Sequence, residues 1–184
     1  ILVMFCDEIV ARKIANSRGE ETIEVTTKTD NIVVVASAPS GKSVGKHEVS
    51  AFSKKGIDFS IAFVNVIGKK LCNEKTAFET FEDLGKIDIL VKQYDATKNL
   101  DVVGGNAIIA LQSSILKALA RFYELSVWKF LVGNKKRITM PMPVGNCIGG
   151  GVHVNQKKKT DIQEFLFIPQ TPSFFDAQFI NTQA

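Results

Sequence analysis

The residues with the clearest chemical potential form one loop, which follows a run of β-branched residues. Segment 36–43 reads Ala-Ser-Ala-Pro-Ser-Gly-Lys-Ser and nearly matches GxxxxGK[ST], a loop whose amides and lysine hold nucleotide phosphates while its hydroxyl binds Mg²⁺. Lys42 and Ser43 would take the last two of these roles. However, Ala36 stands in place of the first glycine, and Pro39 has no amide hydrogen to donate. Nucleotide binding is therefore one alternative for this loop.

Cysteine and histidine offer little further chemistry. Cys6, Cys72 and Cys147 are far apart in the sequence, no CxxC pair occurs, and the chain has 2 histidines. This set does not predict a zinc site. Reduced, unpaired thiols are typical of a cytoplasmic protein, and we expect that location.

The overall composition favours no particular partner. The formal net charge is +4 and 23% of the residues are charged, which fits an anionic substrate and a weak nucleic-acid partner equally well. We therefore expect no specific nucleic-acid binding. The longest apolar run, residues 1–6, is too short to cross a bilayer, so no membrane association is expected.

A small antiparallel sheet is predicted to position the loop. Segments 8–15, 22–26 and 32–35 are rich in apolar and β-branched residues, and 22–26 alternates with period two. Residues 17–19 and 30–31 supply turn signals between them. Because connections this short favour antiparallel neighbours, we expect a three-stranded β-meander.

Helical spacing follows the strands. Apolar residues recur at intervals typical of a helix from 59 to 67, from 78 to 94 and from 108 to 122, and a short amphipathic segment covers 127–131. Strands first and helices afterwards is the α+β order. We therefore predict an α+β domain in which a helical bundle packs on one face of the meander.

The composition changes near Gly133, and we predict two domains, residues 1–137 and 138–184. The basic segment 135–137 is predicted to form a polar hinge between them. Strands are predicted at about 144–148 and 164–168, and a helix is predicted from 173 to 180. This second region reads as strand, loop, strand and helix, with nothing to close its sheet.

Five segments, in order along the chain, resemble motifs of the enolase family. Residues 11–19 resemble ARxxxDSRGNPT, residues 39–48 resemble PSGASTGxxE, and residues 95–108 resemble LDGTxNKxxLGANAI. Residues 140–153 resemble LPVPxxNVxNGGxHA, and residues 163–165 match QEF. The resemblance covers almost the whole chain. It implies the N-terminal domain of an enolase followed by the start of an incomplete β/α barrel.

The resemblance implies a Mg²⁺-dependent lyase that interconverts 2-phosphoglycerate and phosphoenolpyruvate. Such an enzyme removes a proton α to a carboxylate, and Mg²⁺ stabilises the resulting enediolate. It also implies that Ser40 binds the metal, that His153 and Glu164 contact the substrate and take part in catalysis, and that Gln163 contacts the substrate. Residues 39–48 would form a lid loop over the substrate. The lid-loop residues that the resemblance singles out are Ser40, Gly41, Lys42, Ser43 and Gly45.

Several positions depart from the family pattern. Asn16 replaces an aspartate, Glu20-Glu21 replaces Asn-Pro, and Lys42 and Val44 replace an alanine and a threonine of the lid loop. The family's general base and its three carboxylate metal ligands belong to a segment downstream of residue 184. We therefore expect this chain alone to be inactive, and to act as a homo-oligomer or in association with the missing barrel segment.

A non-catalytic alternative also stays open, in which an enolase-derived domain serves as a binding or scaffolding module. Ser40 would then only turn the chain, His153 would be an ordinary loop residue, and Glu164 would face solvent from its strand. Arg18 is expected to be structural or to lie at a subunit interface rather than to act in catalysis.

Overall fold

The computed structural model describes residues 2–41, 44–134, 138–151, 157 and 160–184. The chain divides into two compact units, Ile1–Gly133 and Asn134–Ala184. The boundary predicted after residue 137 falls at residues 135–137, which lie outside the described ranges. It stays a prediction.

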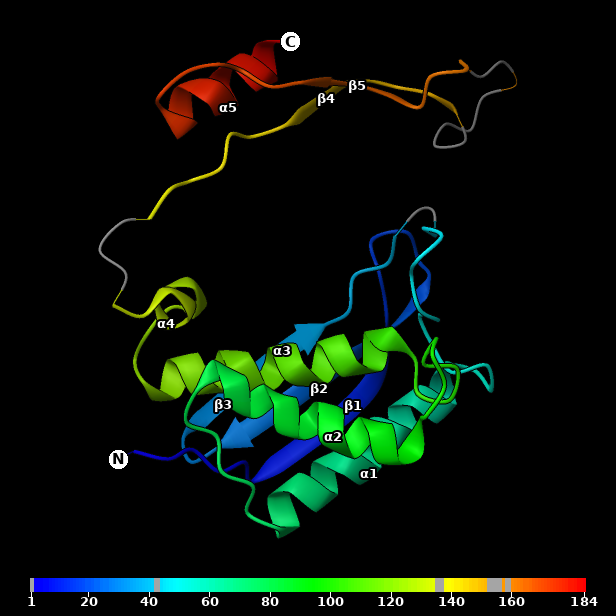
Figure 1. Cartoon of the computed structure of the whole chain (residues 1–184), viewed down its shortest axis with the longest axis vertical. Coiled ribbons are helices and arrows are strands. Elements are labelled where there is room, and N and C mark those ends of the chain that lie inside the picture. The colour runs from blue at the N-terminus through cyan, green and yellow to red at the C-terminus, as the bar shows by residue number, and fades with distance from the viewer. Residues whose placement is uncertain (1, 42–43, 135–137, 152–156, 158–159) are drawn as a thin grey trace. The chain divides into compact units, whose positions relative to one another are not determined.

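The first unit begins with the predicted three-stranded meander, which is confirmed. Strands β1 (Glu8–Ala15), β2 (Glu21–Thr29) and β3 (Ile32–Ser37) pair antiparallel in the order β1-β2-β3 (Figure 1). The two residues between β2 and β3 form a tight turn, in which Asp30 has a φ of 43°. Alternate residues of β2 are buried, as the period-two pattern predicts for a sheet covered on one face.

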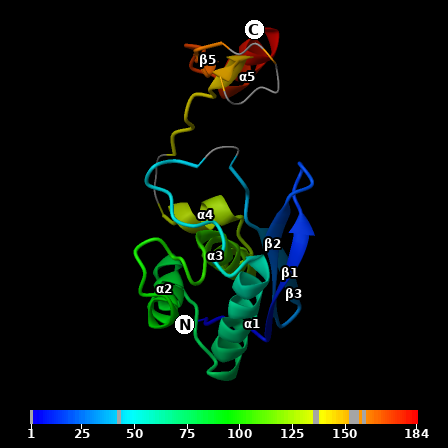
Figure 2. The same cartoon turned by 90° about the vertical axis from the view of Figure 1, so that its right-hand side faces the viewer.

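The described part of the first unit continues with the α-helices α1 (Ile57–Asn73), α2 (Gly85–Tyr94), α3 (Gly105–Phe122) and α4 (Val127–Val132). Helix α1 packs against β1, and α3 packs against β2 and β3. Figure 2 shows the helices on one side of the sheet, so the predicted α+β arrangement is confirmed. The core between sheet and helices is apolar and includes the fully buried side chains of Ile23, Val25, Val64, Ile67, Leu111, Ile115 and Leu119.

The predicted helix from 78 to 94 is wrong over residues 78–84. Phe78 lies in an extended segment that exchanges backbone hydrogen bonds with Met4, at 2.9 and 3.0 Å. A 3₁₀ turn, η1 (Phe81–Leu84), comes next, and the α-helix starts only at Gly85. The Asp83 carboxylate accepts hydrogen bonds from the amides of Glu79 and Thr80, which starts the helical turn at this point. Long-range pairing and a cap thus override the helical spacing.

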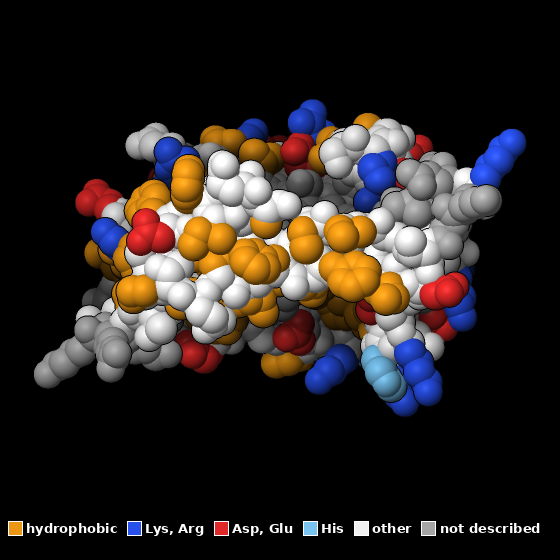
Figure 3. All heavy atoms as spheres, turned by 90° about the horizontal axis from the view of Figure 1, so that it is seen from above, with side chains coloured by type: hydrophobic (Ala, Val, Ile, Leu, Met, Phe, Trp, Pro, Cys, Tyr) orange, Lys and Arg blue, Asp and Glu red, His pale blue; other side chains and the backbone are white. Residues whose placement is uncertain are grey.

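The described part of the second unit contains two strands and a helix, as predicted. Strands β4 (Gly145–Gly149) and β5 (Glu164–Phe167) pair antiparallel with a register shift, and α5 (Phe174–Gln183) follows. Figure 3 shows a band of apolar side chains on one face of the molecule. That this unit begins a β/α barrel remains a prediction. The exposed apolar residues of β4, β5 and α5 include Ile148, Phe165, Leu166, Phe167, Phe175 and Phe179.

A membrane-spanning helix was not expected. Among the described residues, none of the helices combines the length and the apolar composition that crossing a bilayer requires.

Candidate functional site

The lid loop leaves the sheet at a fixed point. The amide of Ala38 donates to the carbonyl oxygen of Ile23 at 3.0 Å, and the Thr22 hydroxyl donates to the Ala38 carbonyl oxygen at 2.8 Å. Both Ala38 and Thr22 are buried. The backbone is therefore anchored on β2 until just before the predicted metal ligand, Ser40.

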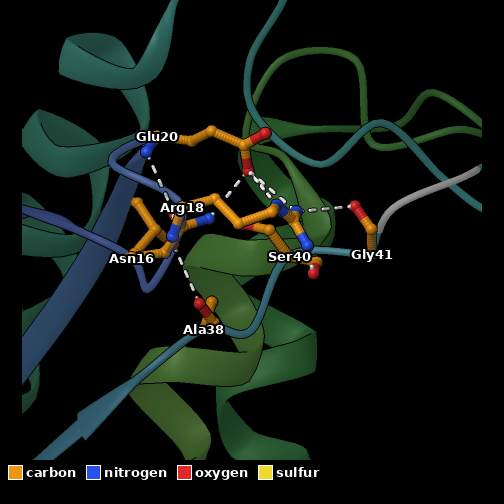
Figure 4. A network of polar contacts seen from close by, with 7 residues as sticks. Asn16, Arg18, Glu20, Ala38, Ser40 and Gly41 are labelled. Atoms are coloured by element: carbon orange, nitrogen blue, oxygen red, sulfur yellow. Dashed lines mark hydrogen bonds and ion pairs between the residues drawn. The ribbon is translucent and has the colours of Figure 1, made fainter. Parts of the chain in front are cut away.

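The turn between β1 and β2 lies beside this point (Figure 4). The Asn16 side-chain oxygen accepts hydrogen bonds from the amides of Arg18, at 2.8 Å, and Glu20, at 3.0 Å. Gly19 has a φ of 76°, a conformation that glycine adopts without strain. The turn is therefore closed by its own side chain, which holds Arg18 and Glu20 on the same side.

The Arg18 guanidinium joins this turn to the lid loop. Its Nη2 lies 3.3 Å from the carbonyl oxygen of Ser40 and 3.1 Å from that of Gly41, and donates to both. Glu20 Oε2 accepts from Arg18 Nε at 3.0 Å and Nη2 at 2.8 Å, and from Asn16 Nδ2 at 2.8 Å. The hydrogen bonds from Arg18, and then from Asn16, lower the pKa of Glu20 below its ordinary value.

The far side of the lid loop has its own turn. The amide of Gly45 donates to Glu48 Oε1 at 2.8 Å, and the amide of Glu48 donates back to the Gly45 carbonyl oxygen at 3.1 Å. The Glu48 carboxylate therefore supports the loop. Lys42 and Ser43, two predicted lid-loop residues, lie outside the described residues.

After the lid loop, the backbone pairs with the segment that leads into α3. The Ser50 amide donates to the Asn99 carbonyl oxygen at 2.9 Å, and the Gly105 amide donates to the Ser50 carbonyl oxygen at 2.8 Å. Gly104 has a φ of 86°, and an added Cβ would lie 2.4 Å from the Phe52 Cα. Only glycine fits at position 104, where the two backbone segments meet. This close contact fixes the base of the lid loop against the start of α3.

Asp95 stabilises the loop that leads into α3. It is buried, and its carboxylate accepts hydrogen bonds from the amides of Thr97, Val102 and Val103 and from the Thr97 hydroxyl. Burial alone would raise the pKa of Asp95, but these hydrogen bonds outweigh it and lower the pKa. The motif at 95–108 therefore has a structural role in this unit.

A hollow of about 480 Å³ lies between the lid loop, the β1–β2 turn and the start of α3. Glu20, Glu21 and Glu48 line it together with Ser40. Across the described ranges, however, no three His, Cys, Asp or Glu side chains are placed to hold a metal ion. These residues do not by themselves form a Mg²⁺ site, and Ser40 could supply one oxygen ligand to a site completed from elsewhere.

The remaining predicted site residues belong to the second unit. Gln163 is exposed and its carbonyl oxygen accepts from the Gly150 amide at 2.6 Å. Glu164 is half-buried at the start of β5, where it pairs with Gly149. His153 lies outside the described residues. Sequence therefore placed Gln163 and Glu164 on or beside a strand correctly, but their roles in the site stay predictions.

The nucleotide-binding alternative loses support from the strand pairing. In the phosphate-binding loop, a strand runs through the glycine-rich segment directly into a helix. Here β3 is an antiparallel strand, and the next helix in the described part of the chain is α1, which begins only at Ile57. The described part of the lid loop thus offers no helix N-terminus that would face a phosphate.

Sequence reasoning missed the contact between Arg18 and the lid loop. The motif Ser-Arg-Gly signalled that Arg18 matters, but nothing in the sequence pointed to its acceptors. Those acceptors are backbone carbonyl oxygens, which every residue carries. The replacement of the family's asparagine by Glu20 was the one available signal, because a carboxylate two residues from an arginine can fix its guanidinium.

Comparison with known proteins shows the family of this chain. A family model described as "Enolase, N-terminal domain" matches residues 6–131. The chain is 40% identical over 164 residues to an enolase of Methanothermobacter thermautotrophicus, covering 89% of this chain and 38% of the relative. It is 38% identical over 175 residues to an enolase of Thermoplasma acidophilum, covering 95% and 42%. The chain thus spans about two fifths of the length of these relatives, and it belongs to the enolase family.

Proposed function

We propose that this chain is the N-terminal part of a phosphopyruvate hydratase, a lyase of glycolysis that interconverts 2-phosphoglycerate and phosphoenolpyruvate. The observation that carries the proposal is the match to the enolase N-terminal domain over 6–131, which includes the lid loop and the elements that anchor it. The proposed setting is the cytoplasm, and the proposed assembly is a homo-oligomer or an association with the rest of the barrel.

The proposed catalysis needs groups beyond this chain. Bound Mg²⁺ would stabilise negative charge on the substrate, and its main ligands would come from the barrel segment, since the described residues form no such site. This chain would contribute Ser40 from the lid loop, His153 at the phosphate end, and Glu164 with Gln163 near the proton-transfer groups. The anchored lid loop would exclude water and place Ser40.

The proposal is tested by following phosphoenolpyruvate formation from 2-phosphoglycerate and Mg²⁺ by ultraviolet absorbance. The 184-residue chain should show no turnover, and the longer protein that contains it should be active. In the longer protein, Ser40→Ala should lower kcat by about tenfold or more. Ser37→Ala is the matched control, because Ser37 is an exposed serine at the end of β3, and it should stay within about twofold of wild type.

Three outcomes would contradict the proposal or one of its parts. An inactive longer protein would remove the hydratase assignment. Clear turnover by the 184-residue chain alone would show that the barrel segment is not needed. Equal rates in Ser40→Ala and Ser37→Ala would mean that the role of Ser40 does not transfer from the family to this chain.

A second candidate is a non-catalytic binding module, which one lid-loop position favours. Val44 replaces the threonine of the family motif and exposes 82% of its surface, so the loop presents an apolar side chain where the motif has a hydroxyl. In this case 2-phosphoglycerate with Mg²⁺ should leave the thermal unfolding midpoint of the longer protein unchanged. A clear upward shift would reject this candidate.

A further inference from the structure

We propose that Arg18 is a positioning residue for the lid loop, and that Glu20 holds it in that role. Arg18 fixes the backbone of Ser40 and Gly41, so it sets where the loop begins to move and where Ser40 is presented. The effect on catalysis rests on the proposed function. The anchoring of the loop does not, and it can be measured without any activity.

The geometry of one nitrogen atom carries the inference. Arg18 Nη2 has two hydrogens and three acceptors within 3.3 Å, namely Glu20 Oε2 and the carbonyl oxygens of Ser40 and Gly41. One hydrogen points to the carboxylate, and the other is shared by two consecutive carbonyl groups. Sharing of this kind requires both carbonyls to face the turn, so the contact selects one backbone conformation at residues 40–41.

Glu20 prevents the guanidinium from turning away. Its Oε2 accepts from Arg18 Nε as well as Nη2, and from Asn16 Nδ2. Asn16 in turn fixes the amides of Arg18 and Glu20. The donor is therefore held in place by the hairpin turn before it meets the loop (Figure 4). The asparagine of the family motif has a single neutral oxygen at this position, whereas Glu20 offers a charge-assisted acceptor.

This cluster is poorly suited to stabilising the fold. The side chains of Arg18 and Glu20 are 38% and 55% exposed, and exposed ion pairs contribute little to stability because water screens them. What the cluster does change is the freedom of the adjacent loop. On one side Ala38 is anchored on β2, and on the other Glu48 closes a separate turn, so residues 40–41 are the described point at which Arg18 adds a constraint.

Amide hydrogen exchange of the 184-residue chain tests the anchoring. Peptides covering residues 39–48 should exchange about tenfold faster in Arg18→Ala than in wild type, and a smaller increase is expected in Glu20→Gln. The matched control is Arg12→Ala, because Arg12 makes an exposed ion pair with Glu24 on the same two strands. Arg12→Ala should leave these peptides unchanged. The thermal midpoints of all three variants should stay within about 3 °C of wild type, which shows that they fold.

Kinetics of the longer protein test the catalytic consequence. Arg18→Ala should lower kcat several-fold with a smaller change in KM, because a loop that samples more positions places Ser40 correctly less often. Arg18→Lys should recover part of the loss, since an ammonium can reach the carbonyls without forming the fork to Glu20. Arg12→Ala should have wild-type kinetics.

The outcomes separate this inference from the proposed function. Unchanged exchange of residues 39–48 in Arg18→Ala would overturn the anchoring. Faster exchange with unchanged kcat in an active longer protein would overturn the positioning role in catalysis. An inactive wild-type longer protein would instead contradict the proposed function, and exchange alone would then decide whether Arg18 anchors the loop.

Discussion

The two compact units of this chain bury their apolar residues to very different extents. In the first unit, sheet and helices enclose a continuous core in which Phe78, Ile23 and Leu111 are fully buried. Within the described part of the second unit, no aromatic or branched aliphatic side chain is buried, and Phe175 exposes 82% of its surface. Both units have regular hydrogen-bonded elements, so hydrogen bonding alone does not distinguish them.

This difference indicates where the stability of the chain comes from. Burial of apolar surface is the dominant favourable term in folding, and a two-stranded sheet is at best marginally stable by itself. We therefore expect the first unit to unfold cooperatively and the second to contribute little to that transition. The exposed apolar residues of β4, β5 and α5 are where the proposed barrel would cover the second unit.

The largest expected effect is on the free energy of unfolding, when one phenylalanine in each unit is replaced by alanine. Phe78→Ala should lower the free energy of unfolding by about 3–5 kcal/mol, because it leaves a cavity in the core. Phe175→Ala, the matched variant in the second unit, should change it by less than about 0.5 kcal/mol. Urea unfolding followed by far-ultraviolet circular dichroism measures both. Similar losses in the two variants would show that the second unit is part of the same cooperative core.

The next largest effect is expected at glycines, where the loss of stability depends on how closely other atoms pack against the backbone. Gly104→Ala should cost about 2–4 kcal/mol, because a Cβ would meet the Phe52 backbone and because φ at Gly104 is positive. Gly56→Ala separates these two causes. Gly56 also precedes a helix with positive φ, but a Cβ there has open space, so only the cost of about 1–2 kcal/mol for backbone strain is expected.

The second unit supplies the contrast for this prediction. A Cβ at Gly149 in β4 would have its nearest neighbour at 4.0 Å, so Gly149→Ala should be nearly neutral. Thermal unfolding of the three variants checks the order. A Gly104→Ala protein as stable as Gly56→Ala would mean that the loop carrying Phe52 moves aside without cost.

A third prediction uses pH to measure a polar cap of the first unit. Hydrogen bonds from Lys86 and from the amides of Thr80 and Glu79 lower the pKa of Asp83 to about 2. The carboxylate therefore stabilises the folded state fully above its ordinary pKa, and this contribution is lost as the pH falls toward 2. Because solvent partly screens this half-buried group, the free energy of unfolding should fall by about 1–2 kcal/mol between pH 5 and pH 2 through Asp83 alone.

Asp83→Asn isolates this contribution from general acid unfolding. The variant should be less stable than wild type at pH 6, and this difference in the free energy of unfolding should narrow as the pH falls. The exposed neighbour Glu82 provides the control, since Glu82→Gln should keep the wild-type pH dependence. A gap that is constant from pH 6 to pH 2.5 would mean that the charge of Asp83 does not stabilise η1.

The sequence predicted the parts of the fold that depend on local patterns. Alternation at 22–26 and the turn at 30–31 were sufficient for the meander, and the spacing of Ile108, Leu111 and Ile115 was sufficient for α3. The spacing of Phe78 with Phe81 was misleading. Phe78 is buried because its backbone pairs with Met4 near the other end of the unit, and no local pattern reports such a pairing.

The candidate site was predictable only as far as its motifs extend. Motifs located the lid loop, and the residue pattern located the strand that carries Glu164, because both depend on residue type and order. They did not predict the hydrogen bonds from Arg18 to the lid loop, since the acceptors on Ser40 and Gly41 are backbone oxygens. The roles of the predicted site residues remain proposals for the experiments above.

The smallest expected effect concerns the cap of α5. The Ser173 hydroxyl accepts a hydrogen bond from the Asp176 amide at 3.3 Å, the second-unit counterpart of the Asp83 cap. Ser173→Ala should weaken α5 locally by about 1 kcal/mol and raise the amide exchange of residues 174–183 several-fold. It should leave the urea midpoint of the chain unchanged, because the second unit adds no buried core to the transition. A shifted midpoint would show instead that α5 is coupled to the folding of the first unit. The two units would then unfold in one cooperative transition, despite their different burial of apolar residues.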